Sequence, residues 1–156
     1  MADTSIFDRL KQDHDAHRQL FEKMADAKDQ PDRLEKLFEQ FKVEVTAHAA
    51  AEEETLYATM LARPDLREDA QHSVSEHKEI DDYLEELEKL PFNGEEWNGV
   101  FAQLKKRYLH HIDEEEEEMF PDAARELTAE EEQKLAALFA KRKPAEIQRA
   151  EADAGD

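Results

Sequence analysis

The stretch His48-Ala49-Ala50-Ala51-Glu52-Glu53 decides how this chain folds, because its pattern recurs sixty-three residues later as His111-Ile112-Asp113-Glu114-Glu115-Glu116. In each copy a His and a Glu stand four residues apart, so on an α-helix both side chains leave the same face, one turn from each other. An imidazole and a carboxylate placed in this way can bind one metal ion together. The same offset relates His14 to His77. The sequence therefore predicts two similar halves, each with a single His and then a His-x-x-x-Glu pair.

The composition is that of one acidic, helical domain. The chain has 156 residues, enough for one hydrophobic core, and three Gly, five Pro and 40% charged residues favour an all-α protein. Its 41 acidic and 21 basic residues give a net charge of −20, which repels nucleic acid and anionic membrane surfaces. The absence of Cys excludes disulfides and thiolate metal sites. Because no apolar signal segment or membrane-spanning run is present, we expect a cytoplasmic protein with no membrane partner.

Apolar residues at steps of three and four predict four long helices. The expected helices run from after Ser5 to about Ala27, from about Asp32 to Leu61, from about Asp65 to Leu90, and from after Gly94 to Pro121, where the proline ends the regular part. The connections between them are short and contain Pro, Asn, Asp or Gly. Short connections imply antiparallel neighbours, so we predict an all-α, up-down-up-down four-helix bundle.

A short C-terminal fifth helix is expected after the bundle. It begins at Thr128-Ala129-Glu130-Glu131, which has the form of a capping box, and ends near Pro144. The last residues, from Glu146 onward, are mostly polar and are expected to be disordered. We therefore predict a bundle domain over residues 1–145 and a polar, disordered tail over residues 146–156.

Six side chains at matched positions of the four inward stripes are candidate metal ligands. They are His14, His48, Glu52, His77, His111 and Glu115. A single His on an apolar face is usually a hydrogen-bonded core residue, but two buried carboxylates without a Lys or Arg in the same stripes are costly. A bound cation removes that cost. Four imidazoles and two carboxylates are too many for one tetrahedral zinc and too rich in nitrogen for calcium or magnesium, whereas two iron ions that share the carboxylates use all six.

Four segments carry a family pattern over residues from about 5 to 143. They are Asp13-His14 with Leu20-Phe21, His48-x-x-x-Glu52-Glu53-x-x-Leu56-Tyr57, Glu76-His77, and His111-x-x-x-Glu115-Glu116-x-x-Met119-Phe120-Pro121. With these segments the chain resembles the hemerythrin-like (HHE cation-binding) family. The resemblance implies a four-helix bundle around two iron ions (Fe2+/Fe3+) with a bridging oxo or hydroxo group. It also implies that the protein binds dioxygen, senses oxygen or iron, or acts on peroxide or nitric oxide.

The third helix departs from the pattern of the oxygen-carrying hemerythrins, which have two histidines one turn apart there. The residue four before His77 is Ser73, so one iron is expected to keep an open or water-filled position. Alternatively His17, one turn from His14 on the same face, supplies a fifth imidazole. The other interpretation of His17 is a hydrogen-bonded core residue.

Two further alternatives concern the second His-x-x-x-Glu pair and its neighbours. His110 and Glu114 also stand four apart, but the sixty-three-residue offset favours His111 and Glu115. We expect Glu53 and Glu116 beside the ligands or on the surface. Tyr57, Tyr83 and Tyr108 could reach the centre, but aromatic residues on these stripes are more often plain core.

These observations predict a non-haem di-iron protein that reacts with a small molecule: hydrogen peroxide, dioxygen or nitric oxide. The alternative is a reversible dioxygen-binding or oxygen- or iron-sensing module without turnover. The incomplete set of histidines favours turnover, because an exchangeable position on a redox metal admits peroxide. We expect no nucleic-acid partner and a monomer or weak homodimer.

Overall fold

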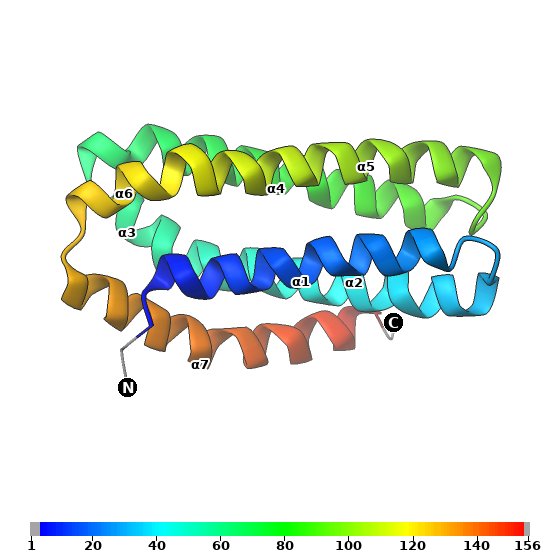
Figure 1. Cartoon of the computed structure of the whole chain (residues 1–156), viewed down its shortest axis with the longest axis horizontal. Coiled ribbons are helices and arrows are strands. Elements are labelled where there is room, and N and C mark those ends of the chain that lie inside the picture. Colours follow the sequence, from blue (N-terminus) through cyan, green and yellow to red (C-terminus); the bar gives the residue numbers. More distant parts are fainter. Residues whose placement is uncertain (1–3, 155–156) are drawn as a thin grey trace.

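The computed structural model describes residues 4–154, and in that range it consists of helices and short connections, with no β-strand. Its elements are α1 (Ile6–Asp26), α2 (Pro31–Glu52), the π-helical turn η1 (Glu53–Tyr57), α3 (Ala58–Leu61), α4 (Pro64–Lys89), α5 (Glu95–Glu114), the π-helical turn η2 (Glu115–Met119), α6 (Phe120–Glu126) and α7 (Ala129–Ala154). Figure 1 shows α1, α2, α4 and α5 as long antiparallel rods, with α7 lying along the side of α1 and α2. The predicted all-α four-helix bundle with a C-terminal fifth helix is confirmed.

Local sequence explains where these helices begin. The Ser5 hydroxyl accepts a hydrogen bond from a backbone N–H in the first turn of α1 (3.2 Å). Pro31 and Pro64 occupy the first turns of α2 and α4, where a missing N–H costs nothing. The expected capping box is present at the start of α7, because the Thr128 side chain accepts from the Glu131 N–H (3.1 Å) and the Glu131 side chain accepts from the Thr128 N–H (3.0 Å).

The interior has a polar layer between two apolar clusters. One cluster gathers the residues near the start of α1 and the end of α2, with Phe120 of α6 and Phe139 of α7. The other gathers the opposite ends of the same helices around Phe41 and Trp97. Each fully buried aromatic side chain contributes about 1.5–3 kcal/mol of hydrophobic stabilisation, so the two clusters hold the four helices rigidly on both sides of the polar layer.

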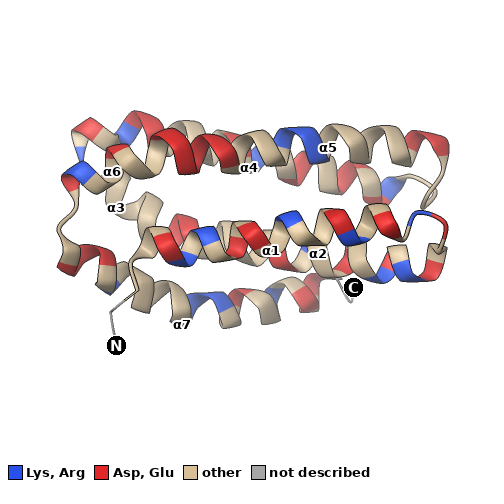
Figure 2. Cartoon of the chain, viewed as in Figure 1, with Lys and Arg blue, Asp and Glu red and all other residues tan. Residues whose placement is uncertain are grey.

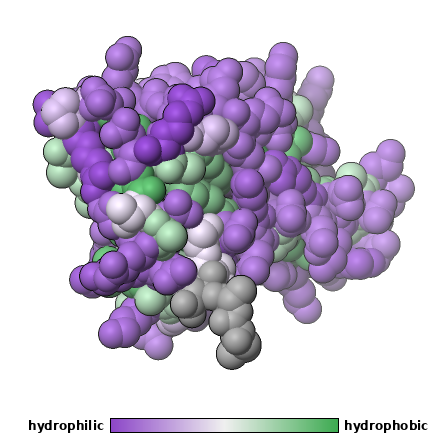
Figure 3. All heavy atoms as spheres, turned by 60° about the vertical axis from the view of Figure 1, so that its left-hand side comes forward, coloured by the Kyte–Doolittle hydropathy of each residue, from purple (hydrophilic) through white to green (hydrophobic). Residues whose placement is uncertain are grey.

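The surface is dominated by charged side chains. Acidic residues are spread along every long helix (Figure 2), and hydrophilic side chains cover most of the face in Figure 3, with a smaller apolar area near one end of the bundle. Among the described residues, only Leu61 and Leu138 are large hydrophobic side chains that are clearly exposed. None of the described helices combines the length and the apolar character needed to cross a lipid bilayer.

The C-terminal helix does not end near Pro144, as the sequence predicted. α7 has 26 residues and continues to Ala154, so the expected disordered tail is wrong for residues 146–154, while residues 155–156 lie outside the described range. Proline inside a helix costs about 3 kcal/mol because it removes one hydrogen bond and crowds the preceding turn. Here Lys143, Glu146 and Ala150 are buried against the bundle on both sides of the proline, and this packing outweighs the local penalty. The helical bundle therefore does not stop at residue 145.

Pro121 does not end the fourth long helix either. The chain keeps helical dihedral angles through Glu115 and Phe120 and runs through η2 into α6 as far as Glu126. In η2 the Phe120 N–H bonds to the carbonyl five residues earlier, at Glu115, so the widened turn lies directly before the residue that has no N–H to give. This turn, η2, begins at Glu115, and the other π-helical turn, η1, begins directly after Glu52. Both irregular turns therefore adjoin the Glu of a His-x-x-x-Glu pair.

Removing residues 146–156 tests the corrected boundary. The shortened chain loses the buried Ala150 and the partly buried Ile147, so its free energy of unfolding should fall by about 2 kcal/mol and its melting temperature by about 6 °C. Thermal unfolding followed by circular dichroism measures this, with a chain that lacks only residues 155–156 as the control. An unchanged melting temperature would support the original prediction that residues 146–156 form a disordered tail.

Candidate metal centre

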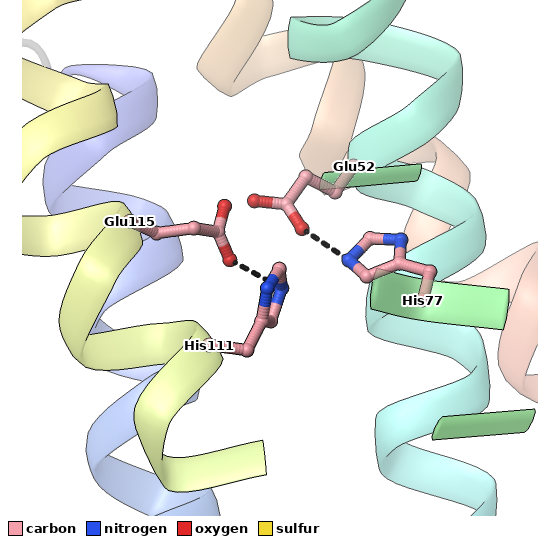
Figure 4. A group of neighbouring side chains, drawn as sticks. All are labelled: Glu52, His77, His111 and Glu115. Atoms are coloured by element: carbon pink, nitrogen blue, oxygen red, sulfur yellow. Dashed lines mark ion pairs between the residues drawn. The ribbon is translucent and has the colours of Figure 1, made fainter. Parts of the chain in front are cut away.

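The six candidate ligands meet in the polar layer of the bundle, and none of them is more than 6% exposed. The donor atoms of Glu52, His77, His111 and Glu115 all lie within 4.8 Å of one another, and so do those of His14, His48 and Glu52. Figure 4 shows the Glu52 and Glu115 carboxylates pointing toward each other, with His77 and His111 below them. Glu52 belongs to both groups, so it can bridge two ions.

Each carboxylate faces one histidine from each half of the chain. Glu52 Oε1 lies 3.6 Å from His48 Nε2 and 3.3 Å from His77 Nε2. Glu115 Oε1 lies 2.9 Å from His111 Nε2 and 3.7 Å from His14 Nε2. All four imidazoles therefore present Nε2 to the small volume that also holds the two carboxylates.

The other ring nitrogen of each histidine is hydrogen-bonded to a carboxylate. The four Nδ1 contacts are His48 to Asp13 (2.8 Å), His111 to Glu76 (2.8 Å), His14 to Glu116 (2.7 Å) and His77 to Glu53 (3.3 Å). A carboxylate that accepts from Nδ1–H fixes the tautomer and leaves the Nε2 lone pair free for a metal ion. These partners obey the sixty-three-residue offset as well, since Asp13 matches Glu76 and Glu53 matches Glu116.

Several buried polar atoms at the centre make no hydrogen bond within the protein, although histidines lie close to them. They include His14 Nε2, both carboxylate oxygens of Glu52, and Glu115 Oε1. A buried polar atom without a hydrogen bond costs about 1–3 kcal/mol, and more when it is charged. Burial and then the neighbouring Glu115 carboxylate raise the pKa of Glu52 well above its ordinary value. A bound cation would satisfy all of these atoms at once, so the donor set fits a metal centre.

The model of the hemerythrin HHE cation binding domain matches residues 5–123 of the chain. The chain belongs to the hemerythrin HHE cation-binding family. A crystal structure of an HHE cation binding domain-containing protein from Mycobacterium kansasii has the same fold, with a TM-score of 0.82 at 21% identity over 94% of this chain and 89% of that one. A DNA nickase from Nostoc sp. (strain PCC 7120 / SAG 25.82 / UTEX 2576) is 28% identical over 142 residues, which are 88% of this chain and 38% of the nickase. The chain thus spans well under half the length of that curated relative.

The two halves of this HHE domain differ beside His77. Tyr57 has Phe120 as its repeat partner. The Tyr57 hydroxyl donates a hydrogen bond to Glu115 Oε2 (2.8 Å) and lies 3.4 Å from His77 Nε2, whereas the Phe120 ring stacks beside His14 with the ring centroids 6.0 Å apart. Burial and then the charge of Glu115 raise the pKa of Tyr57 well above its ordinary value, so the hydroxyl keeps its proton. One half of the centre therefore has a proton donor where the other has an apolar ring.

A pocket reaches the centre of the HHE domain from the surface between α4 and the α5–η2 segment. Its volume is about 70 Å3, and Ser73, Glu115 and Met119 form part of its wall. Ser73 is buried and donates a hydrogen bond to Met119 Sδ (3.1 Å). The repeat partner of Ser73 is Leu10, so the polar opening also belongs to the half that contains His77.

His17 and His110 occupy different environments. The His17 ring is buried, its Nδ1 bonds to the Tyr108 hydroxyl (2.7 Å), and its Nε2 lies 3.9 Å from Glu44 with no hydrogen-bond partner. It belongs to neither group of converging donor atoms, so its role as a fifth ligand stays a prediction. The His110 side chain is 62% exposed and contacts Glu114 on the outside of the bundle.

Sequence reasoning missed three contributors to the centre. The repeated Asp13-His14 and Glu76-His77 pairs signalled that an acid precedes each lone histidine, but their role behind His48 and His111 appears only in three dimensions. No sequence pattern pointed to Lys143, because it lies on α7, far from Asp13 in the sequence, and its Nζ donates to Asp13 Oδ1 (2.9 Å) only in the folded chain. Burial opposes the shift, but the hydrogen bond from His48 and then the charge of Lys143 hold the pKa of Asp13 well below its ordinary value.

Replacing the two adjacent histidines separately tests the assignment of the ligands. His111→Ala should weaken metal binding by at least about 100-fold, because even the partners behind a ligand contribute about 10- to 100-fold. His110→Ala should bind metal as the unaltered protein does, since its side chain lies in solvent. Titration of the metal-free variants with Co2+, followed by absorption, measures both. Retained binding in His111→Ala with loss in His110→Ala would overturn the assignment.

Proposed function

We propose that this HHE domain is a non-haem di-iron protein that reacts with small oxidants: hydrogen peroxide, dioxygen or nitric oxide. The observation that carries the proposal is the pair of buried donor groups that share Glu52, with carboxylate oxygens that no protein group satisfies. His14 and His48 would hold one ion, and His77 and His111 the other, with Glu52 and Glu115 shared. Mixed imidazole and carboxylate donors suit iron.

Bound iron would supply the electrons or the coordination position that peroxide, dioxygen or nitric oxide requires. The chain's own groups support this use in two ways. The Tyr57 hydroxyl holds a proton 2.8 Å from Glu115 Oε2, within reach of the centre. The opening of about 70 Å3 beside Ser73 admits only small molecules, and the buried surroundings exclude bulk water.

A reversible dioxygen-binding or sensing role is the second candidate. A small cavity of about 10 Å3 borders His48, His77, His111 and Tyr108, on the face of the centre that the histidines form. That is about the least volume that holds one water molecule, so any ligand bound there must be very small. A stable adduct without consumption of the ligand would favour this role.

DNA nicking, for which the Nostoc relative is named, is no part of the proposal. The matched segment makes up 38% of that protein. The net charge of −20 repels a phosphate backbone, and acidic residues are spread over all the long helices in Figure 2.

Metal analysis combined with a peroxide assay tests the proposal directly. The metal-free protein, reloaded with Fe2+ without oxygen, should retain two iron ions per chain after desalting and should then consume hydrogen peroxide. One zinc ion and no retained iron would refute the di-iron centre. Two iron ions with a long-lived oxygen adduct and no peroxide consumption would favour the second candidate.

The Tyr57 hydroxyl provides a more specific test. Tyr57→Phe removes the proton donor beside Glu115 but keeps the ring, so iron content should stay the same while peroxide consumption falls at least about tenfold. Tyr83→Phe is the matched control, because Tyr83 borders a separate surface pocket with Gln103 and Arg107. Equal rates in the two variants would show that the hydroxyl has no part in the reaction.

A further inference from the structure

We propose that His72, Glu76 and Glu114 bind a divalent cation at the mouth of the pocket beside Ser73, and that Fe2+ passes through this site to the centre. The proposal rests on the di-iron function above, and it adds a third metal site with a loading role. His72 lies on α4, one turn before Glu76, and Glu114 is the last residue of α5.

The geometry is that of a small cation site. His72 Nε2 lies 3.0 Å from Glu114 Oε1 and 3.5 Å from Glu76 Oε1, and one donor atom of each residue lies within 4.8 Å of the others. One imidazole and two carboxylates suit Fe2+ and Mn2+. The side chains are 56%, 28% and 6% exposed for His72, Glu114 and Glu76, so the site extends from solvent into the protein.

The site is continuous with the two-ion centre. The pocket that His72 borders also reaches Glu115, whose Oε1 is buried and has no hydrogen-bond partner. Glu76 contacts both places, since its Oε1 lies 3.5 Å from His72 Nε2 and 2.8 Å from His111 Nδ1. A cation at the mouth would therefore be one carboxylate away from the groups that hold a metal ion in the interior.

The charge of the pocket favours cations. Asp69, Glu118 and Asp122 complete its acidic wall, and the described residues that line it include no Lys or Arg. Arg125 pairs with Asp122 from the exposed side (3.0 Å). Figure 2 shows the run of acidic residues where α5 passes toward α6. A concave surface of one sign concentrates counter-ions and raises their association rate by about 10- to 1000-fold.

The other half of the repeat is closed to a cation at the matched position. Arg9 is the repeat partner of His72, and its guanidinium pairs with Asp13, the partner of Glu76 (2.6 Å). Lys143 from α7 occupies the same carboxylate oxygen (2.9 Å). The side chains of Arg9 and Lys143 therefore occupy the position that a metal ion would take beside Asp13. A route for cations is open only on the side of His72.

Titration with Mn2+ tests the site itself. The iron-loaded protein should bind one additional Mn2+ per chain, measured by loss of the electron paramagnetic resonance signal of free Mn2+. The double variant His72→Ala, Glu114→Gln should bind this ion at least about tenfold more weakly. Glu86→Gln, an equal loss of charge at an exposed position of α4, should bind it as the unaltered protein does. No additional Mn2+, or equal binding in the double variant, overturns the site.

Uptake of Fe2+ tests the route. Transfer of Fe2+ into the metal-free protein, measured in competition with a chromogenic chelator, should be at least about tenfold slower in the double variant, with two ions per chain at the end. Equal uptake rates in the double variant and Glu86→Gln would overturn the loading role. A failure of the unaltered protein to hold two iron ions would instead refute the di-iron centre, and the difference in Mn2+ binding between the double variant and Glu86→Gln would still decide the third site.

Discussion

Two carboxylates that face each other in the interior, Glu52 and Glu115, set the constraint on which the rest of the molecule depends. Both are buried between the apolar clusters of the bundle, and three of their four oxygen atoms have no hydrogen-bond partner in the protein. Such a pair is unfavourable unless positive charge is brought to it. Four imidazoles are held around the pair by carboxylates on their outer nitrogens, and a cation bound between them would neutralise it. Folding and metal binding would then be coupled in this protein.

The two halves follow the same plan but differ beside the centre. Three substitutions between them make the half around His77 more polar or more open: a tyrosine for Phe120, a serine for Leu10, and a histidine for Arg9. The half around His14 is instead covered by α7, whose Lys143 is buried against Asp13. The pseudo-symmetric centre thus has a closed side, suited to holding an ion, and an accessible side, suited to exchange.

Helical periodicity made the four long helices and the positions of the six candidate ligands predictable, because a spacing of four residues fixes which side chains share a face. Predictions from local rules failed at Pro121 and Pro144. A π-helical turn before the first and tertiary packing around the second outweighed the penalty of proline, and neither is visible in a short window. Tyr57 was expected to be plain core, since the direction of its hydroxyl depends on the same kind of turn. Lys143 lies 130 residues from Asp13, beyond any local pattern.

The acidic pocket also bears on what the proposed di-iron centre could react with. Its carboxylates would attract cations during the proposed loading, yet they leave neutral molecules unaffected. Hydrogen peroxide, dioxygen and nitric oxide are all neutral and small, so an opening of about 70 Å3 with an acidic wall admits them. Anionic oxidants meet repulsion at the same wall, and larger organic substrates do not fit. One opening can therefore serve both metal loading and the exchange of small neutral molecules, because the two processes need different properties of the same surface.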